Sequence, residues 1–136
     1  MIGLSTFLSA DFTKNGDVVT DSKTGLAWQD DAIGSQMSWQ SAIDYCEALT
    51  LDTYEDWRMP NINELKSIVD RSKGEPAIVD GFENIGTNSF YRYWSSTTSI
   101  VGIEYYYAWI VNFNYGYVLG SSKDNYYYVC CVRDGQ

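Results

Sequence analysis

Histidine is absent from this sequence of 136 residues. It is the commonest general base and the commonest neutral metal ligand in proteins, so its absence removes both functions together. A Ser-His or Cys-His nucleophile pair is excluded, and a zinc-dependent active site is not expected. The three cysteines have no CxxC spacing, which argues against metal binding. We therefore predict a protein that is not an enzyme, with no catalytic residues, no metal site and no cofactor.

Positive charge is also scarce. Nine Lys and Arg residues stand against 18 Asp and Glu residues, which gives a net charge of −9. A protein that binds nucleic acid gains affinity by neutralising phosphates with Lys and Arg. Nucleic acid is therefore not an expected partner.

Long apolar runs are missing as well. None approaches the roughly 18 residues that can cross a bilayer, so no membrane insertion is expected. Residues 1–8 lack a basic n-region and a sustained apolar stretch, and no signal peptide is visible. A protein acting outside a cell would then arrive by another route, such as within a virion, or after removal of a leader. The length suits a single domain over residues 1–136.

Tyrosine is abundant instead. The chain has 12 tyrosines, ten of them after residue 90. In the runs 105–107 and 126–128, consecutive strand residues would face opposite sides, so at most two of each three can point inward. Clustered exposed aromatics mark interfaces, and antibody binding surfaces combine Tyr with Ser and Asn. We interpret these runs as a binding surface; packing at the edge of a sheet is the alternative.

The first half of the chain carries the helical signals. Residues 1–37 have the pattern of short strands and turns. Ser38 is a good N-cap for a helix over about residues 39–50. Asn61, with Glu64 three positions later, resembles a capping box that begins a second helix.

From residue 94 onward the pattern indicates strands. Residues 109–114 alternate strictly, which is typical of a strand with two distinct faces. The inward face would consist of Trp109, Val111 and Phe113. The outward face would consist of Ile110, Asn112 and Asn114. With a final strand over residues 126–132, the pattern predicts an α+β fold in which two helices pack on antiparallel sheet.

Two groups of charged residues allow a functional and a structural interpretation. Asp56-Trp57-Arg58 could be a catalytic carboxylate beside a cation, but we expect a structural ion pair and a core tryptophan. Asp30-Asp31, Glu55-Asp56 and Asp80 supply oxygen ligands of the kind that calcium prefers. No loop of alternating acidic ligands surrounds them, so we expect solvated turns.

The cysteines leave two possibilities open. Cys46 lies on the predicted buried face of the first helix, and Cys130 and Cys131 would point to opposite faces of a strand, so only one of them can meet it. Either Cys46 and Cys131 form a disulfide, or all three thiols are reduced and pack as small apolar side chains.

Six blocks of the sequence form a recognisable pattern. The most distinctive is Asp56-Trp57-Arg58-Met59-Pro60-Asn61. The others are residues 21–29, Trp39-Gln40-Ser41-Ala42, Tyr93-Trp94-Ser95-Ser96-Thr97, Ala108-Trp109 and Cys131-Val132-Arg133. Together they resemble a bacterial domain family typified by the C-terminal domain of collagen-like adhesins, over about residues 18–133. The resemblance implies a C-type-lectin-like fold, related to that of formylglycine-generating enzymes, with Cys46 and Cys131 close together. The family usually has Arg in place of Cys130, which leaves an odd thiol in this chain. The calcium-dependent sugar motif of animal C-type lectins is absent, so the resemblance does not imply sugar binding.

Residues 94–133 also resemble the variable region of proteins diversified by a diversity-generating retroelement, which mutates adenines of a template. This divides the chain into a scaffold over about 1–97 and a variable ligand-binding region over about 98–133. The residues expected to be fixed are Trp94, Ser95, Ser96, Thr97, Ala108, Trp109, Val111, Phe113, Gly116, Val118, Lys123, Cys131, Val132 and Arg133. The variable residues expected to contact a ligand are Tyr105, Tyr106, Tyr107, Ile110, Asn112, Asn114, Tyr115, Tyr117, Leu119, Ser121, Ser122, Asp124, Asn125, Tyr126 and Tyr127. Residues 99–103 and Gly120 are also placed among the variable positions, although Glu104 between them cannot be reached from an Asn codon by adenine changes.

These resemblances imply a function of recognition. We expect a non-enzymatic binding protein, displayed on a virion or cell surface, that recognises a protein or glycan on a target through its diversified face. The alternative is a glycan-binding adhesin domain with a fixed specificity, in which tyrosines stack on sugar rings. An enzyme of the formylglycine-generating type would share the fold, but no suitable pair of active-site cysteines is evident. Assembly into an oligomer is compatible with the sequence, since related surface proteins often trimerise.

Overall fold

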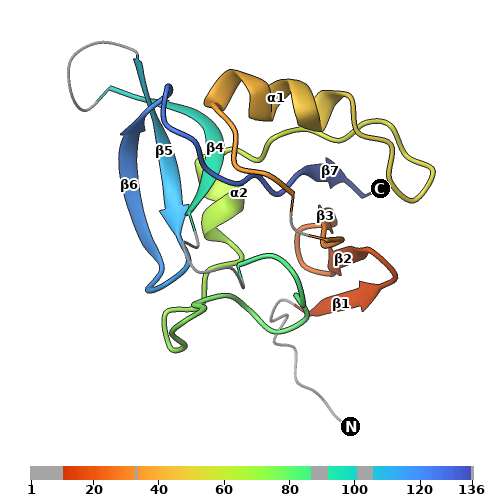
Figure 1. Ribbon diagram of the computed structural model, residues 1–136. Coiled ribbons are helices and arrows are strands. Elements are labelled where there is room, and N and C mark those ends of the chain that lie inside the picture. The colour runs from red at the N-terminus through yellow and green to blue at the C-terminus, as the bar shows by residue number, and fades with distance from the viewer. Residues whose placement is uncertain (1–10, 33, 87–91, 101–105, 136) are drawn as a thin grey trace, which may run out of the picture.

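The described residues form two antiparallel sheets and two short helices (Figure 1). A computed structural model describes residues 11–32, 34–86, 92–100 and 106–135. The first sheet, in spatial order, contains β1 (Phe12–Asn15), β2 (Val18–Asp21), β3 (Leu26–Gln29) and β7 (Val132–Asp134). The second contains β4 (Arg92–Ser99), β5 (Tyr107–Asn112) and β6 (Tyr117–Ser122). The α+β prediction is thus confirmed at the level of two helices and antiparallel pairing.

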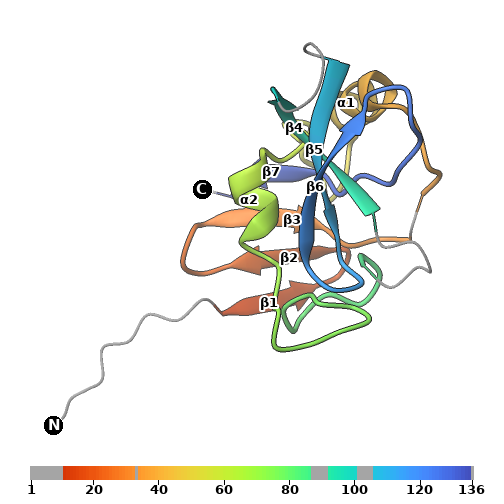
Figure 2. The same ribbon diagram turned by 90° about the vertical axis from the view of Figure 1, so that its left-hand side faces the viewer.

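The last strand, β7, forms one edge of the first sheet. Figure 2 shows the four strands one above another, with β7 beside β3. The final strand predicted over 126–132 is wrong in extent, because only Val132–Asp134 joins the ladder. Before it, Tyr127 and Tyr128 make isolated bridges to Met37 and Tyr93. The chain has to cross from one sheet to the other here, so it cannot remain in a single regular strand.

Both helices begin where their caps predict. Helix α1 (Trp39–Glu47) follows Ser38, whose hydroxyl accepts from the Ser41 N–H, and it ends earlier than the predicted residue 50. Helix α2 (Ile62–Lys66) follows Asn61, and both hydrogen bonds of the capping box with Glu64 are present. Within the described ranges, neither helix is long and apolar enough to cross a membrane.

Both faces of the second sheet are covered, which a single alternating strand cannot reveal. On one face, Trp94, Ala108 and Ile110 pack with the buried residues of α1, including Ala42. On the other face, Tyr93, Val111 and Phe113 pack in a second core cluster that includes residues of α2 and β3. The placement of Ile110 on an exposed face is therefore wrong. It alternates with Val111 as predicted, but α1 covers its side and leaves it 1% exposed.

Asp30, at the end of β3, is also buried rather than part of a solvated turn. Its carboxylate is 0% exposed and pairs with the ammonium group of Lys14 at 2.7 Å. It accepts three backbone N–H bonds at 2.8–2.9 Å, from residues 83–85. A buried charge is tolerated when it is paired and hydrogen-bonded in this way. Asp30 therefore ties β1 and the segment at 83–85 to the end of β3.

The Asp56-Trp57-Arg58 block has structural roles, as expected. Trp57 is in the core, and Arg58 forms a bidentate salt bridge with Glu64, with both hydrogen bonds at 2.8 Å. Asp56 pairs with Arg133 rather than with its own neighbour, at 2.6 Å. The block fastens the start of α2 and the last strand to the domain.

Candidate ligand-binding surface

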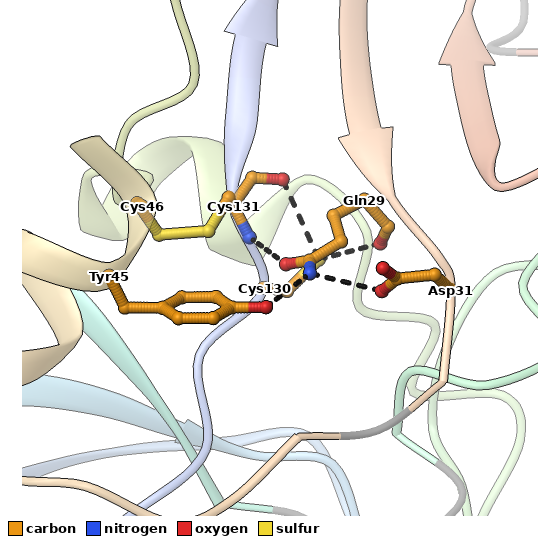
Figure 3. Close-up of a disulfide and its surroundings, with 6 residues drawn as sticks. All are labelled: Gln29, Asp31, Tyr45, Cys46, Cys130 and Cys131. Carbon is orange, nitrogen blue, oxygen red and sulfur yellow. Dashed lines mark hydrogen bonds between the residues drawn. A yellow bond between two sulfur atoms is a disulfide. The ribbon is translucent and has the colours of Figure 1, made fainter. Parts of the chain in front are cut away.

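A disulfide fixes the end of the tyrosine-rich segment (Figure 3). It joins Cys46 of α1 to Cys131, with a Cα–Cα distance of 5.5 Å and a sequence separation of 85. Of the two possibilities for these cysteines, the structure has the disulfide, in agreement with the proximity that the family resemblance implied. Gln29 adds to the anchor, because its side-chain oxygen accepts from the Cys131 N–H at 3.0 Å and its amide donates to the Tyr45 hydroxyl at 3.0 Å.

Cys130 points away from the disulfide and is a free, buried thiol. It donates to the backbone carbonyl of Gln29 at 3.2 Å. Burial, with a smaller effect of the carboxylates of Asp30 and Asp31, raises the pKa of Cys130 well above its usual range. The thiol therefore stays protonated at neutral pH and is a packing residue rather than a nucleophile.

The hairpin of β5 and β6 carries most of the predicted ligand residues. Its register runs from Tyr107–Ser122 to Asn112–Tyr117. The turn requires glycine at position 116, where φ is +87° and a Cβ would lie 2.8 Å from Cγ1 of Val69. The end of the hairpin is thus held against the segment that follows α2. Among the described strands, β6 has a neighbour on one side only.

The predicted ligand residues differ widely in exposure. Exposed ones are Tyr106, Tyr115, Tyr117, Leu119, Asp124, Asn125 and Tyr126. Half-buried ones are Tyr107, Asn112, Asn114, Ser122 and Tyr127. Ile110 and Ser121 are buried, and Tyr105 lies outside the described residues. Like Ile110, Ser121 faces inward, and its hydroxyl bonds the Tyr127 hydroxyl at 2.8 Å. Neither can meet a ligand directly.

One row of residues crosses the second sheet on the side of α1. Arg92, Asn112 and Tyr117 are paired across the three strands, so their side chains share a face. The next row contains Leu119, which is exposed although its partner Ile110 is covered. Exposed side chains thus gather at the hairpin end of this face.

A second exposed group lies at the other end of β6. There the Tyr106 hydroxyl donates to a carboxylate oxygen of Asp124 at 2.7 Å. This hydrogen bond and the negative charge of Asp124 favour the protonated phenol and raise the pKa of Tyr106. The structure therefore brings the predicted residues together in two groups rather than in one compact patch.

Lys123, predicted to be fixed, holds the loop after β6. Its ammonium group lies 3.9 Å from the ring centre of Trp39 and donates to the Thr98 hydroxyl at 2.9 Å. Its backbone N–H donates to the carbonyl of Tyr106, and its carbonyl accepts from the Trp39 N–H. The loop is thereby fastened to the start of α1 and to β4, so the exposed residues beside it stand on a fixed backbone.

A groove beside this face was not predicted. It is lined by Gln36, Arg92 and the tyrosines at 126–128. The segment 126–128 runs beside β4, because the Tyr128 N–H donates to the Arg92 carbonyl and the Trp94 N–H donates to the Tyr128 carbonyl. A basic residue between two tyrosines, as in Tyr91-Arg92-Tyr93, was the available signal in the sequence.

In residues 94–133, the positions expected to be fixed and those expected to be variable differ in solvent exposure. Every described residue that was expected to be fixed is buried or half-buried. All nine exposed residues in the described part of this stretch were expected to be variable: Ile100, Tyr106, Tyr115, Tyr117, Leu119, Gly120, Asp124, Asn125 and Tyr126. The buried exceptions in the variable set are Ser99, Ile110 and Ser121.

A family profile matches most of the chain. The profile of the Lcl C-terminal domain matches residues 17–133, and no curated protein matches the chain. In the parts of the chain that the structure describes, no three Cys, Asp or Glu side chains are placed to hold a metal ion together. The match spans both helices and every strand from β2 to β6, and it implies a C-type-lectin-like fold. The chain therefore belongs to the Lcl C-terminal domain family, a family of non-catalytic binding domains.

Proposed function

We propose that the protein recognises a macromolecular target through the two exposed groups within residues 106–127, and that these residues are diversified by a retroelement. The observation that carries the proposal is the separation of exposed from buried positions in residues 94–133. A scaffold that tolerates diversification has to keep variation out of its close-packed core. All nine exposed residues of this stretch are types that adenine changes of an Asn codon can produce, while three of the positions assigned as variable are buried.

The mechanism is preorganised display. The disulfide, Lys123 and the docked turn at Gly116 hold the backbone, so exposed tyrosines meet a target without ordering a loop first. Tyrosine gives a large contact area for the loss of two torsions, and the neighbouring Asn125 and Asp124 supply hydrogen-bonding groups. Display outside the cytoplasm, on a virion or a cell, is consistent with a disulfide, because disulfides persist in oxidising compartments.

The test is to sequence the DNA that flanks the gene. The proposal expects a near-copy of the codons for residues 94–133 that differs mainly where the copy has adenines, next to a gene for a reverse transcriptase. The mismatched codons should fall on exposed positions. Absence of such a copy would refute diversification and leave a binding surface of constant sequence.

A fixed-specificity glycan-binding domain is the second candidate. The exposed ring of Tyr126, beside the groove with Arg92 and Gln36, favours it, because an exposed aromatic ring can stack on a sugar. A glycan array decides between the two. One saccharide class that competes for this face and loses binding on Tyr126→Ala would support the second candidate.

A further inference from the structure

We infer that the groove beside Arg92 binds the carboxylate of an Asp or Glu side chain on a protein target, with an adjoining apolar side chain against Tyr126. The inference rests on the proposed function, because it assigns ligand chemistry to one part of the same recognition surface. Arg92 precedes the region predicted to vary, so it would be a constant contact beside variable ones.

Arg92 is an exposed residue whose guanidinium has no carboxylate partner in the described part of the chain. Arg58 and Arg133, by contrast, are each paired with carboxylates at 2.6–2.8 Å. A guanidinium presents donors in a planar fork that matches a carboxylate.

Of the three tyrosines that line the groove, two are held by ring contacts and one is exposed. Tyr127 packs edge-on against Trp94 with ring centres 4.9 Å apart, and Tyr128 packs against Tyr93 at 5.7 Å. Both rings are half-buried and held by these contacts. Tyr126 is 62% exposed, so its ring is available to an apolar group of a ligand.

The polar groups of the groove favour an acceptor-rich ligand. The lining residues are one arginine, one glutamine and three tyrosines, none with a carboxylate, and the Tyr127 hydroxyl is already bonded to Ser121. A neutral sugar can use the Gln36 carbonyl and the phenol oxygens as acceptors, but it leaves the charge of the guanidinium unpaired, whereas a carboxylate ligand pairs with it. The lining therefore favours an acidic ligand group over a neutral sugar.

The net charge of the chain limits the net charge of a protein target that can approach this groove. A net charge of −9 repels a strongly acidic partner at long range. The groove thus fits a single carboxylate within an otherwise neutral or basic stretch of protein. Asn112 and Tyr117, in the same row as Arg92, extend the contact with uncharged groups.

The experiment is an NMR titration of the full chain, with the disulfide intact, using two matched probes: N-acetyl-Phe-Glu-amide and N-acetyl-Phe-Gln-amide. We expect saturable shifts at the amides of residues 126–128 and at Nε of Arg92, with roughly fivefold weaker binding of the Gln probe, as for an exposed ion pair. Arg92→Gln should abolish the difference between the probes. Arg71→Gln is the control, because Arg71 also has no ion pair among the described residues but lies against Gly116 and Val69.

Three results would overturn the inference: equal binding of both probes, a preference that survives Arg92→Gln, or tighter binding of glucuronate than of the Glu probe. The last would assign the groove to an acidic glycan. Failure here is distinguishable from failure of the proposed function, because the flanking-DNA test is independent of what occupies this groove.

Discussion

Tyr126 and Tyr127 are neighbours in the chain, yet their side chains are held differently. The Tyr126 ring is exposed, whereas Tyr127 packs on Trp94 and bonds the Ser121 hydroxyl. Asn125 donates to the same Ser121 hydroxyl at 2.9 Å. Two adjacent tyrosines of one run can therefore differ in role: one is exposed to a ligand, and the other holds the backbone in place.

Substitution of these two residues should separate their roles. Tyr126→Ala should change the free energy of unfolding by less than about 0.5 kcal/mol, because an exposed ring loses little on truncation. Tyr127→Ala should cost about 2 kcal/mol, through the lost ring contact with Trp94 and the lost hydrogen bond to Ser121. Urea denaturation of the two variants is the measurement. Equal losses would contradict the structural role given to Tyr127.

Ile110 and Leu119 form a second matched pair. They are partners across β5 and β6, but Ile110 is 1% exposed and Leu119 is 43% exposed. Ile110→Ala should cost about 3 kcal/mol, since it leaves a cavity between the sheet and α1. Leu119→Ala should cost about 0.5 kcal/mol. If thermal or urea unfolding ranks them in the opposite order, the coverage of this face by α1 is wrong.

At the scale of the elements, the starts of the helices were predictable and their ends were not. Ser38 and the Asn61–Glu64 capping box are local signals, because each depends on residues within one turn. The end of α1 and the extent of β7 depend on where the chain must cross between sheets. That crossing is set by contacts distant in sequence, such as the bridge between Met37 and Tyr127.

The capping box of α2 also predicts how stability responds to acid. Burial raises the pKa of Glu64, but the hydrogen bonds from Arg58 and the Asn61 N–H outweigh it, and the pKa lies below the model-peptide value of 4.5. A carboxyl whose pKa is lowered by folding stabilises the protein above its unfolded pKa, and loses that contribution as the pH falls through the folded one.

We therefore expect Glu64→Gln to be less stable than the parent at neutral pH, with the difference shrinking below about pH 4.5 as the parent loses its charge. Urea unfolding at a series of pH values measures this. Glu55→Gln, at an exposed position, is the control and should show no such convergence. A difference that stays constant down to about pH 2 would mean that the charge of Glu64 contributes nothing.

At the scale of the whole molecule, the two-sided burial of the second sheet was beyond the sequence. Alternation in residues 109–114 identifies two faces but does not say what covers each. The family resemblance supplied what the pattern lacked, namely the fold and the proximity of Cys46 and Cys131. The Arg92 groove was missed because its lining comes from segments around residues 36, 92 and 127, which only the folded chain brings together.

The disulfide should make a large contribution to global stability. A cross-link between residues 85 apart restricts the unfolded chain strongly, and removal by Cys46→Ala with Cys131→Ala should cost about 4 kcal/mol. Cys130→Ala, which removes a buried thiol and its hydrogen bond to Gln29 but leaves the cross-link intact, should cost about 1 kcal/mol. Urea unfolding of both variants, with reduced and oxidised parent, provides the measurement. A double variant as stable as Cys130→Ala would show that the cross-link does not stabilise the fold.

The position of that disulfide also affects how a binding domain would bear mechanical load from a bound target. Cys131 follows Tyr126 by a few residues, and the bond then passes directly into α1. Tension applied by a captured target at Tyr126 would travel along this short stretch of main chain and cross a covalent bond into the helix. Hydrogen bonds between Tyr128 and β4 would share part of that load. The covalent path to α1 does not depend on them, so it would still hold under shear that separates a hairpin joined only by hydrogen bonds.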